Sequence, residues 1–114
     1  MDNADKLLVL WTTENPETAM NMVLMYAHNA RLNNWWNEVN LLVWGASQTL
    51  IVKSTMVQSK IFKMIRDGVN VIACRKCAEN LGVAEQLKAL NIHVFYTGEY
   101  LTEWLRSGHK MLCI

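Results

Sequence analysis

Short apolar runs alternate with helical patterns along the whole chain, and this alternation restricts the fold more than any other feature. The runs have strand length and cover Lys6 to Trp11 (KLLVLW), Glu38 to Trp44 (EVNLLVW), Val69 to Ala73 (VNVIA), Ile92 to Tyr96 and Lys110 to Ile114. Continuous apolar runs are typical of parallel strands that are covered on both faces. We therefore expect a single α/β domain over residues 1–114, with a mainly parallel sheet of about five strands flanked by helices.

Helical patterns fill the segments between these runs. Asn15, Pro16 and Glu17 give a start signal, because Asn caps a helix, Pro suits its first turn and Glu favours the positive dipole end. This helix is predicted to run to about Asn33. Further on we expect a short helical turn over Gln48 to Val52, helices over 55–66, 83–90 and 99–107, and a helix-turn of unspecified shape over 75–81.

Charge and composition limit the partners of the chain. It has 11 basic and 10 acidic residues, a formal net charge of +1, which argues against a broad nucleic-acid surface. Five Trp and seven Met, in a chain that is 52% hydrophobic, favour a homo-oligomer, since such residues are enriched at interface cores. The Trp35-Trp36 pair, in an Asn-rich loop, is read as interface rather than as a lid over a neighbouring subunit.

Location is predicted from what the sequence lacks. No apolar run approaches the roughly 20 residues that span a bilayer, so we expect no membrane partner. The polar start, Met1 to Asp5, is unlike a secretory signal. The three cysteines are accordingly expected to be reduced thiols in the cytoplasm.

Right-handed crossovers between parallel strands place every post-strand loop at one edge of the sheet, where ligands bind in such folds. This edge is the predicted site. Its candidate pocket residues are Thr12, Thr13, Asn15, Trp44, Gly45, Ser47, Thr97 and Gly98, and it also receives the segment Cys74-Arg75-Lys76-Cys77.

The paired cysteines carry the recognisable chemistry of this edge. A thiol where a strand passes into a helix lies near free backbone N–H groups, which favour the nucleophilic thiolate, and Arg75 and Lys76 add positive charge. One CxxC supplies two of the four ligands of a structural zinc site, so no metal is expected. Two buried thiols that merely pack as hydrophobes are a second reading. A pairing of Cys74 with His28 or His93 in space stays open.

No phosphate-binding glycine loop is present, so we expect no cofactor. The only proline, Pro16, precedes the CxxC, whereas thioredoxin-like enzymes have a cis-proline after it.

Three segments resemble the DsrE/DsrF-like sulfur-relay family, and together they extend over most of the chain. They are VNVIACRKCAENLGV, WGASQTL after the second strand, and TGEYLTEWLRSGHKMLCI at the end, the last resembling an uncharacterised DsrE-like branch. In the family a strand leads into a cysteine, followed eight positions later by a glycine. Cys74 and Gly82 hold these two positions, and Cys77 matches a second cysteine found in some branches.

The resemblance implies a three-layer α/β/α fold, homo-oligomers that are often trimers or hexamers, and Cys74 as the residue that bears a persulfide. Sulfur would come from a donor protein and pass to an acceptor protein, with Cys77 resolving the persulfide as a disulfide. Two other functions stay open. One is a non-enzymatic binding or assembly module, indicated by the Met and Trp content, and the other is a thiol-disulfide redox sensor.

Overall fold

A parallel sheet forms the centre of the computed structural model, which describes residues 5–114. Its strands are β1 (Lys6–Trp11), β2 (Glu38–Val43), β3 (Asn70–Cys74), β4 (His93–Phe95) and β5 (Lys110–Cys113). They lie in the order β4-β3-β2-β1-β5, and every pairing is parallel. The predicted α/β class is confirmed. Residues 1–4, on which the reading of the N-terminus rested, lie outside the described residues.

The helical segments between the strands match the predicted ones closely. They are α1 (Pro16–Thr18), η1 (Ala19–Val23), α2 (Leu24–Leu32), α3 (Ala46–Lys53), α4 (Thr55–Arg66), α5 (Arg75–Leu81), α6 (Ala84–Ala89) and α7 (Gly98–Ser107). The first three form one continuous segment with a π-helical turn in its middle, and the Asn15 side chain caps it by accepting from the Thr18 N–H at 2.9 Å.

Two helical boundaries differ from the sequence prediction. The helix after β2 begins at Ala46 and has eight residues, where a short turn over Gln48 to Val52 was expected. Gly45 permits this early start, because its φ of 72° lets the chain turn sharply at the end of β2. The segment after β3, whose shape the sequence left open, is the regular helix α5, which ends at Gly82 in the left-handed conformation.

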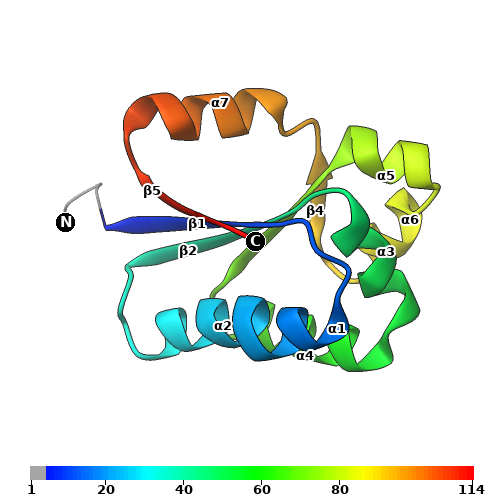
Figure 1. Cartoon of the computed structure of the whole chain (residues 1–114), viewed down its shortest axis with the longest axis horizontal. Helices are drawn as coiled ribbons and strands as arrows, with labels where there is room; N and C mark the ends of the chain where they lie inside the picture. Colours follow the sequence, from blue (N-terminus) through cyan, green and yellow to red (C-terminus); the bar gives the residue numbers. More distant parts are fainter. Residues whose placement is uncertain (1–4) are drawn as a thin grey trace.

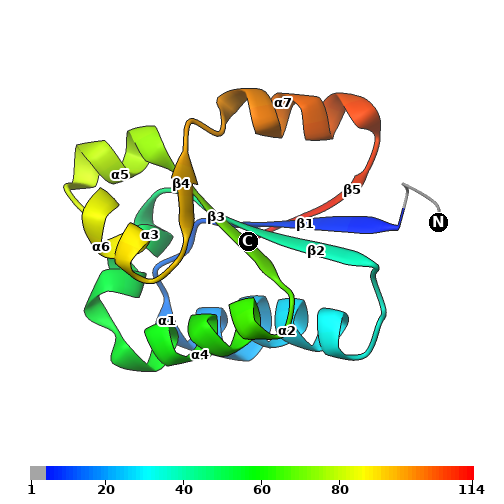
Figure 2. The same ribbon diagram turned by 180° about the vertical axis from the view of Figure 1, so that it is seen from behind.

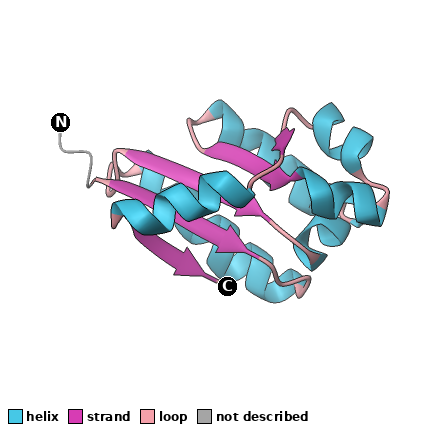
Figure 3. Ribbon diagram, turned by 90° about the horizontal axis from the view of Figure 1, so that it is seen from above, coloured by secondary structure: helices cyan, strands magenta, loops and turns pink. Residues whose placement is uncertain are grey.

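The order of the strands explains how the helices are distributed over the two faces of the sheet. From β1 to β4 the chain progresses in one direction, and the last connection then returns past β1 to reach β5. Because parallel crossovers are right-handed, a reversal of direction moves the connecting helix to the opposite face. Accordingly α7 lies on one face, whereas α2 and α4 cover the other (Figures 1 and 2). Seen from above, α7 lies across the strands (Figure 3).

Each face of the sheet carries its own hydrophobic cluster. The larger one lies under α2 and α4 and includes Trp11, Leu41 and Met64, which are fully buried. The smaller one lies under α7 and consists of Leu8, Leu42, Ile72 and Trp104. Neighbouring residues of a strand contribute to opposite clusters, as in Leu41 and Leu42, so the continuous apolar runs are explained by burial on both faces. Within residues 5–114, no helix combines the length and apolar character that a bilayer crossing requires.

Candidate functional site

The chain leaves neighbouring strands in opposite directions at the carboxyl ends of β3 and β4. After β3, helices α5 and α6 bury Ala78 and Leu87 in the cluster on the α2 and α4 face. After β4, α7 buries Trp104 on the other face. The carboxyl ends of strands that diverge in this way are the usual binding place in parallel α/β sheets. Cys74 ends β3 and Thr97 follows β4, so both residues lie at this edge of the sheet.

Hydrogen bonds surround the Cys74 sulfur. The side chain is almost fully buried, with 4% of its surface exposed. Burial by itself raises the pKa of this thiol, but hydrogen bonds from the backbone N–H groups of Cys77 and Lys76, the Thr97 hydroxyl and the Cys77 thiol lower it, and the net shift is downward. The buried Thr97 hydroxyl has no hydrogen-bond partner among the described residues, so it is available to donate to the Cys74 sulfur. The surroundings of Cys74 therefore favour its thiolate.

Cys77 has the opposite tendency. It is partly exposed, and burial raises the pKa of its thiol. The Gly45 N–H donates to its sulfur and lowers the pKa, whereas its own hydrogen bond and charge interaction with Cys74 raise it, so the net shift is upward. The two sulfurs are thus direct neighbours. Cys74 is the more acidic thiol of the pair.

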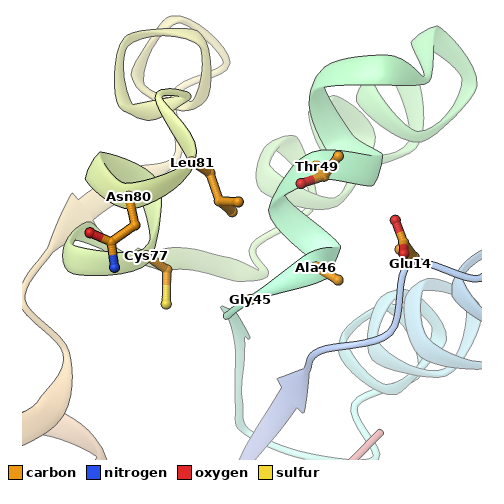
Figure 4. A pocket seen from close by; sticks show the side chains of 7 residues that line it. All are labelled: Glu14, Gly45, Ala46, Thr49, Cys77, Asn80 and Leu81. Atoms are coloured by element: carbon orange, nitrogen blue, oxygen red, sulfur yellow. The ribbon is translucent and has the colours of Figure 1, made fainter.

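A cavity of about 390 Å³ lies beside Cys77, between the first turn of α3 and helix α5. Its walls come from the loop after β1 and from both helices, and the residues that line it are Glu14, Gly45, Ala46, Thr49, Cys77, Asn80 and Leu81 (Figure 4). Gly45 borders open space, because a Cβ at this position would meet no atom within 4 Å. Cavities of this size accept small molecules.

Two polar residues at the start of α3 tie the strand ends together. Gln48 is fully buried, and its Nε2 donates to the carbonyl oxygens of Val43 at 3.1 Å and Cys74 at 3.0 Å. Ser47 donates through Oγ to the carbonyl oxygen of Trp11 at 2.7 Å. These bonds connect α3 to the ends of β1, β2 and β3 beneath the site.

Several predicted pocket residues have structural partners. Thr12 donates to the carbonyl oxygen of Ile114 at 3.1 Å, and Thr13 accepts from the Asn15 N–H at 3.1 Å. Trp44 packs against the hydrophobic cluster under α7. Gly98 is the first residue of α7. Of the predicted set, only Gly45 and Cys77 line the cavity, and Thr97 contacts Cys74. Thr12, Thr13, Asn15, Trp44, Ser47 and Gly98 surround the same edge of the sheet without lining it.

The charged side chains next to the cysteines are occupied elsewhere. Arg75 lies 3.2 Å from Glu79 and 5.0 Å from the centre of the Tyr96 ring. The Lys76 side chain is exposed, and this residue acts on Cys74 through its backbone N–H. The acidity of Cys74 thus comes from backbone and side-chain hydrogen bonds rather than from these two cations.

The histidines that the sequence left as partners of Cys74 have other contacts. His28 bridges Asp67, at 2.8 Å from Nε2, and Lys60, at 2.7 Å from Nδ1, and so links α2 to α4. His93 packs on Phe95. In the part of the chain that the structure describes, no three His, Cys, Asp or Glu side chains gather as metal ligands.

Sequence reasoning named the loop from Thr12 to Asn15 but did not single out Glu14, and it overlooked Gln48, Thr49, Asn80 and Leu81. A signal existed for Gln48, because a glutamine one turn into a helix that starts at a strand end faces free carbonyl groups. Asn80 and Leu81 could not be assigned, since the helical form of 75–81 was undecided.

The chain was compared with known proteins. No protein-family model matches it, and no curated protein sequence does. Among solved structures, the conserved protein of unknown function BT1422 from Bacteroides thetaiotaomicron is 45% identical, with a TM-score of 0.97, over 100% of this chain and 98% of that one. The ychN protein from E. coli, which has a DsrE-like fold, is 16% identical, with a TM-score of 0.73, over 96% of this chain and 97% of that one. The second likeness shows the fold alone, and it agrees with the DsrE-like architecture.

Proposed function

We propose that this chain, which belongs to the same family as BT1422 of Bacteroides thetaiotaomicron, carries sulfane sulfur as a persulfide on Cys74. The observation that supports the proposal is the neighbouring pair of sulfurs, of which Cys74 has a lowered and Cys77 a raised pKa. An acidic thiol is a good nucleophile at neutral pH, and a protonated neighbour supplies a proton to a departing sulfur. The resemblance to DsrE-like sulfur-relay proteins favours the same chemistry.

Loading transfers one sulfur atom without net oxidation. The Cys74 thiolate attacks the outer sulfur of a donor persulfide, R–S–SH, a new sulfur–sulfur bond forms, and R–S⁻ leaves. The Cys74 persulfide then has two fates. An acceptor thiolate can take the outer sulfur and restore the Cys74 thiolate. Alternatively, the Cys77 thiolate attacks the inner sulfur, which releases HS⁻ and leaves a Cys74–Cys77 disulfide, so that the sulfane sulfur is reduced and the two thiols are oxidised.

Intact-protein mass spectrometry after exposure to a sulfane-sulfur donor tests this proposal. The wild type and Cys113→Ser should gain the mass of one sulfur atom, and Cys74→Ser should not. Cys77→Ser should keep the adduct longer, because it lacks the resolving thiol. An adduct of equal yield in Cys74→Ser would refute Cys74 as the carrier. A Cys74–Cys77 disulfide in the wild type, together with no sulfur adduct on Cys77→Ser, would instead support the redox sensor.

We also propose that the chain assembles into a homo-oligomer, such as a trimer or hexamer, in a reducing compartment such as the cytoplasm. Large apolar side chains are exposed on the helices of one layer, and these include Met22, Met25, Met56 and Phe62. Trp35, which follows α2, is 56% exposed. Light scattering coupled to size-exclusion chromatography should give a mass above that of one chain. A purely monomeric protein would contradict this assembly and, with it, the alternative of an assembly module.

A further inference from the structure

The cavity beside Cys77 has a thiol on one side and a carboxylate on the other. Figure 4 shows Cys77 on α5 and Glu14 in the loop after β1, with Gly45 and Ala46 between them. Among the described residues that line the cavity, Glu14 is the only one with a charged side chain. No lysine or arginine offsets this charge within the lining, so the cavity has a negative wall.

Glu14 is free to receive a ligand. No salt bridge or hydrogen bond within residues 5–114 involves its carboxylate, whereas Glu38, Glu79 and Glu85 each pair with a cation. The Asn15 and Thr13 side chains beside it are engaged in the local turn and in the cap of α1. The backbone that holds Glu14 is therefore fixed at the start of the helix, and its side chain is not used by the fold.

The part of the cavity between the Cys77 thiol and the Glu14 carboxylate has room for a small molecule that contacts both groups. Gly45 leaves open space where any other residue would place a Cβ. Its N–H lowers the pKa of the Cys77 thiol, so the polarity near the sulfur is opposite to that at Glu14. Backbone N–H groups near the sulfur favour the negative charge of a reacting or departing thiolate. The carboxylate at the opposite wall favours a positive charge.

We infer that the cavity selects low-molecular-weight sulfur compounds that carry a positive charge, such as aminothiol persulfides, and disfavours anionic ones. Glu14 is the specificity-determining residue. Charge selection at Cys77 follows from the cavity alone, whereas the identification of these compounds as sulfur donors rests on the proposed function. In the donor reaction, the persulfide R–S–SH gives its outer sulfur to the Cys74 thiolate and leaves as R–S⁻. The ammonium group of R stays at Glu14 during this transfer.

Charged thiol-modifying reagents test the selection without any sulfur relay. The Cys113→Ser protein would be treated with a cationic reagent, trimethylammonioethyl methanethiosulfonate, or with an anionic one, sulfonatoethyl methanethiosulfonate. Peptide mass spectrometry then measures how fast the free Cys77 thiol disappears with each reagent. Each rate is divided by that of the same reagent with a small thiol in solution. We expect the normalised cationic rate to exceed the anionic one by about tenfold at low salt, the range that local fields produce, and the excess to shrink at high salt.

Matched variants assign the effect to one carboxylate. Glu14→Gln should bring the ratio of the normalised cationic rate to the normalised anionic rate close to one, and Glu14→Lys should invert this ratio. Glu17→Gln removes a nearby exposed charge that does not line the cavity, and it should leave the ratio unchanged. A ratio of one or less in the unmodified cavity, or a preference that survives Glu14→Gln, would overturn the inference.

A second measurement separates this inference from the proposed function. Cysteamine persulfide and glutathione persulfide would be compared as donors, with the sulfur adduct on Cys74 as readout. Faster loading from the cationic donor, lost in Glu14→Gln, supports both proposals. Equal loading from both donors keeps the carrier function and overturns the selection. If Cys77 prefers the cationic reagent but neither donor gives a sulfur adduct on Cys74, the carrier function is overturned and the charge selection stands.

Discussion

The Gln48 side chain donates to the carbonyl oxygen of Cys74 at 3.0 Å and, from the same nitrogen, to that of Val43 at 3.1 Å. A helix side chain thereby fixes the backbone of the residue that bears the acidic thiol. Both carbonyl groups are at the end of a strand. The position of Cys74 is thus set from α3 as well as from its own strand.

Replacing Gln48 with Leu should destabilise the protein and disturb the site together. The substitution keeps the approximate side-chain volume but removes a donor from two buried carbonyl oxygens, at a cost of about 1–3 kcal/mol each. Removal of the buried Oε1, which has no hydrogen-bond partner among the described residues, offsets part of this cost. We expect the free energy of unfolding in urea to fall by about 2–4 kcal/mol. Loading of Cys74 from a persulfide donor should slow as well, because its backbone is no longer held.

Gln58 provides the matched control for this substitution. Its Nε2 also donates to two carbonyl oxygens, those of Ile51 at 2.9 Å and Val52 at 3.4 Å, but away from the cysteines. Gln58→Leu should lower the stability without affecting the loading rate of the remaining folded protein. If both variants load equally fast, Gln48 is a structural residue only.

The Thr97 hydroxyl should set part of the acidity of Cys74. A hydroxyl that donates to the sulfur stabilises the thiolate, so Thr97→Val should raise the pKa of Cys74 toward its ordinary value. An ultraviolet thiolate titration of the Cys113→Ser protein measures this shift. Thr102→Val, which removes a hydroxyl that donates to the Gly98 carbonyl oxygen on α7, should leave the titration unchanged. An unaltered Cys74 titration in Thr97→Val would assign the acidity to the backbone N–H groups.

The strands and helices could be read from the sequence because each apolar run has to be buried on both faces of a parallel sheet. α4 has the predicted bounds, Thr55–Arg66, and the strand ends agree within one residue. The placement of Cys74 at the end of β3 followed from the same reasoning. Local patterns, such as the Asn15 cap with Pro16 after it, determined where the first helix begins.

The contents of the cavity could not be read in this way, since they depend on which side chains from separate elements meet. Glu14, Thr49 and Asn80 are distant in sequence and have no shared periodicity. Thr12 and Thr13 look equally suited to a pocket in the sequence, yet hydrogen bonds to Ile114 and Asn15 engage them. Whether a loop hydroxyl is free or bonded is decided by the three-dimensional path of the chain.

Asp67 should make stability depend on acidic pH. Hydrogen bonds from Arg66 and then from His28 lower the pKa of its carboxyl to about 2. A carboxyl whose pKa is lower in the folded than in the unfolded chain stabilises the fold above the unfolded value of 3.8, and this contribution is lost as the pH falls toward about 2. Between pH 3.8 and about 2, the unfolding free energy of Asp67→Asn should therefore decline less steeply with falling pH than that of the wild type. Urea denaturation at a series of pH values measures this decline. Glu99→Gln, an exposed control on α7, should retain the wild-type slope. An unchanged slope in Asp67→Asn would contradict the assignment.

Gly45→Ala should narrow the cavity that Cys77 faces. Its φ of 72° and ψ of −136° form a conformation that is nearly restricted to glycine, and the added methyl group would enter the open floor. We expect a loss of unfolding free energy of about 1–3 kcal/mol and a severalfold slower reaction of Cys77 with thiol reagents. Gly82→Ala is the matched control, because Gly82 also has a positive φ, 70°, and open space at its Cβ, but does not line the cavity. It should lose about 1–2 kcal/mol while Cys77 reacts at the wild-type rate. Equal reaction rates in both variants would mean that reagents reach Cys77 by another route, and Glu14 would then lie outside their path.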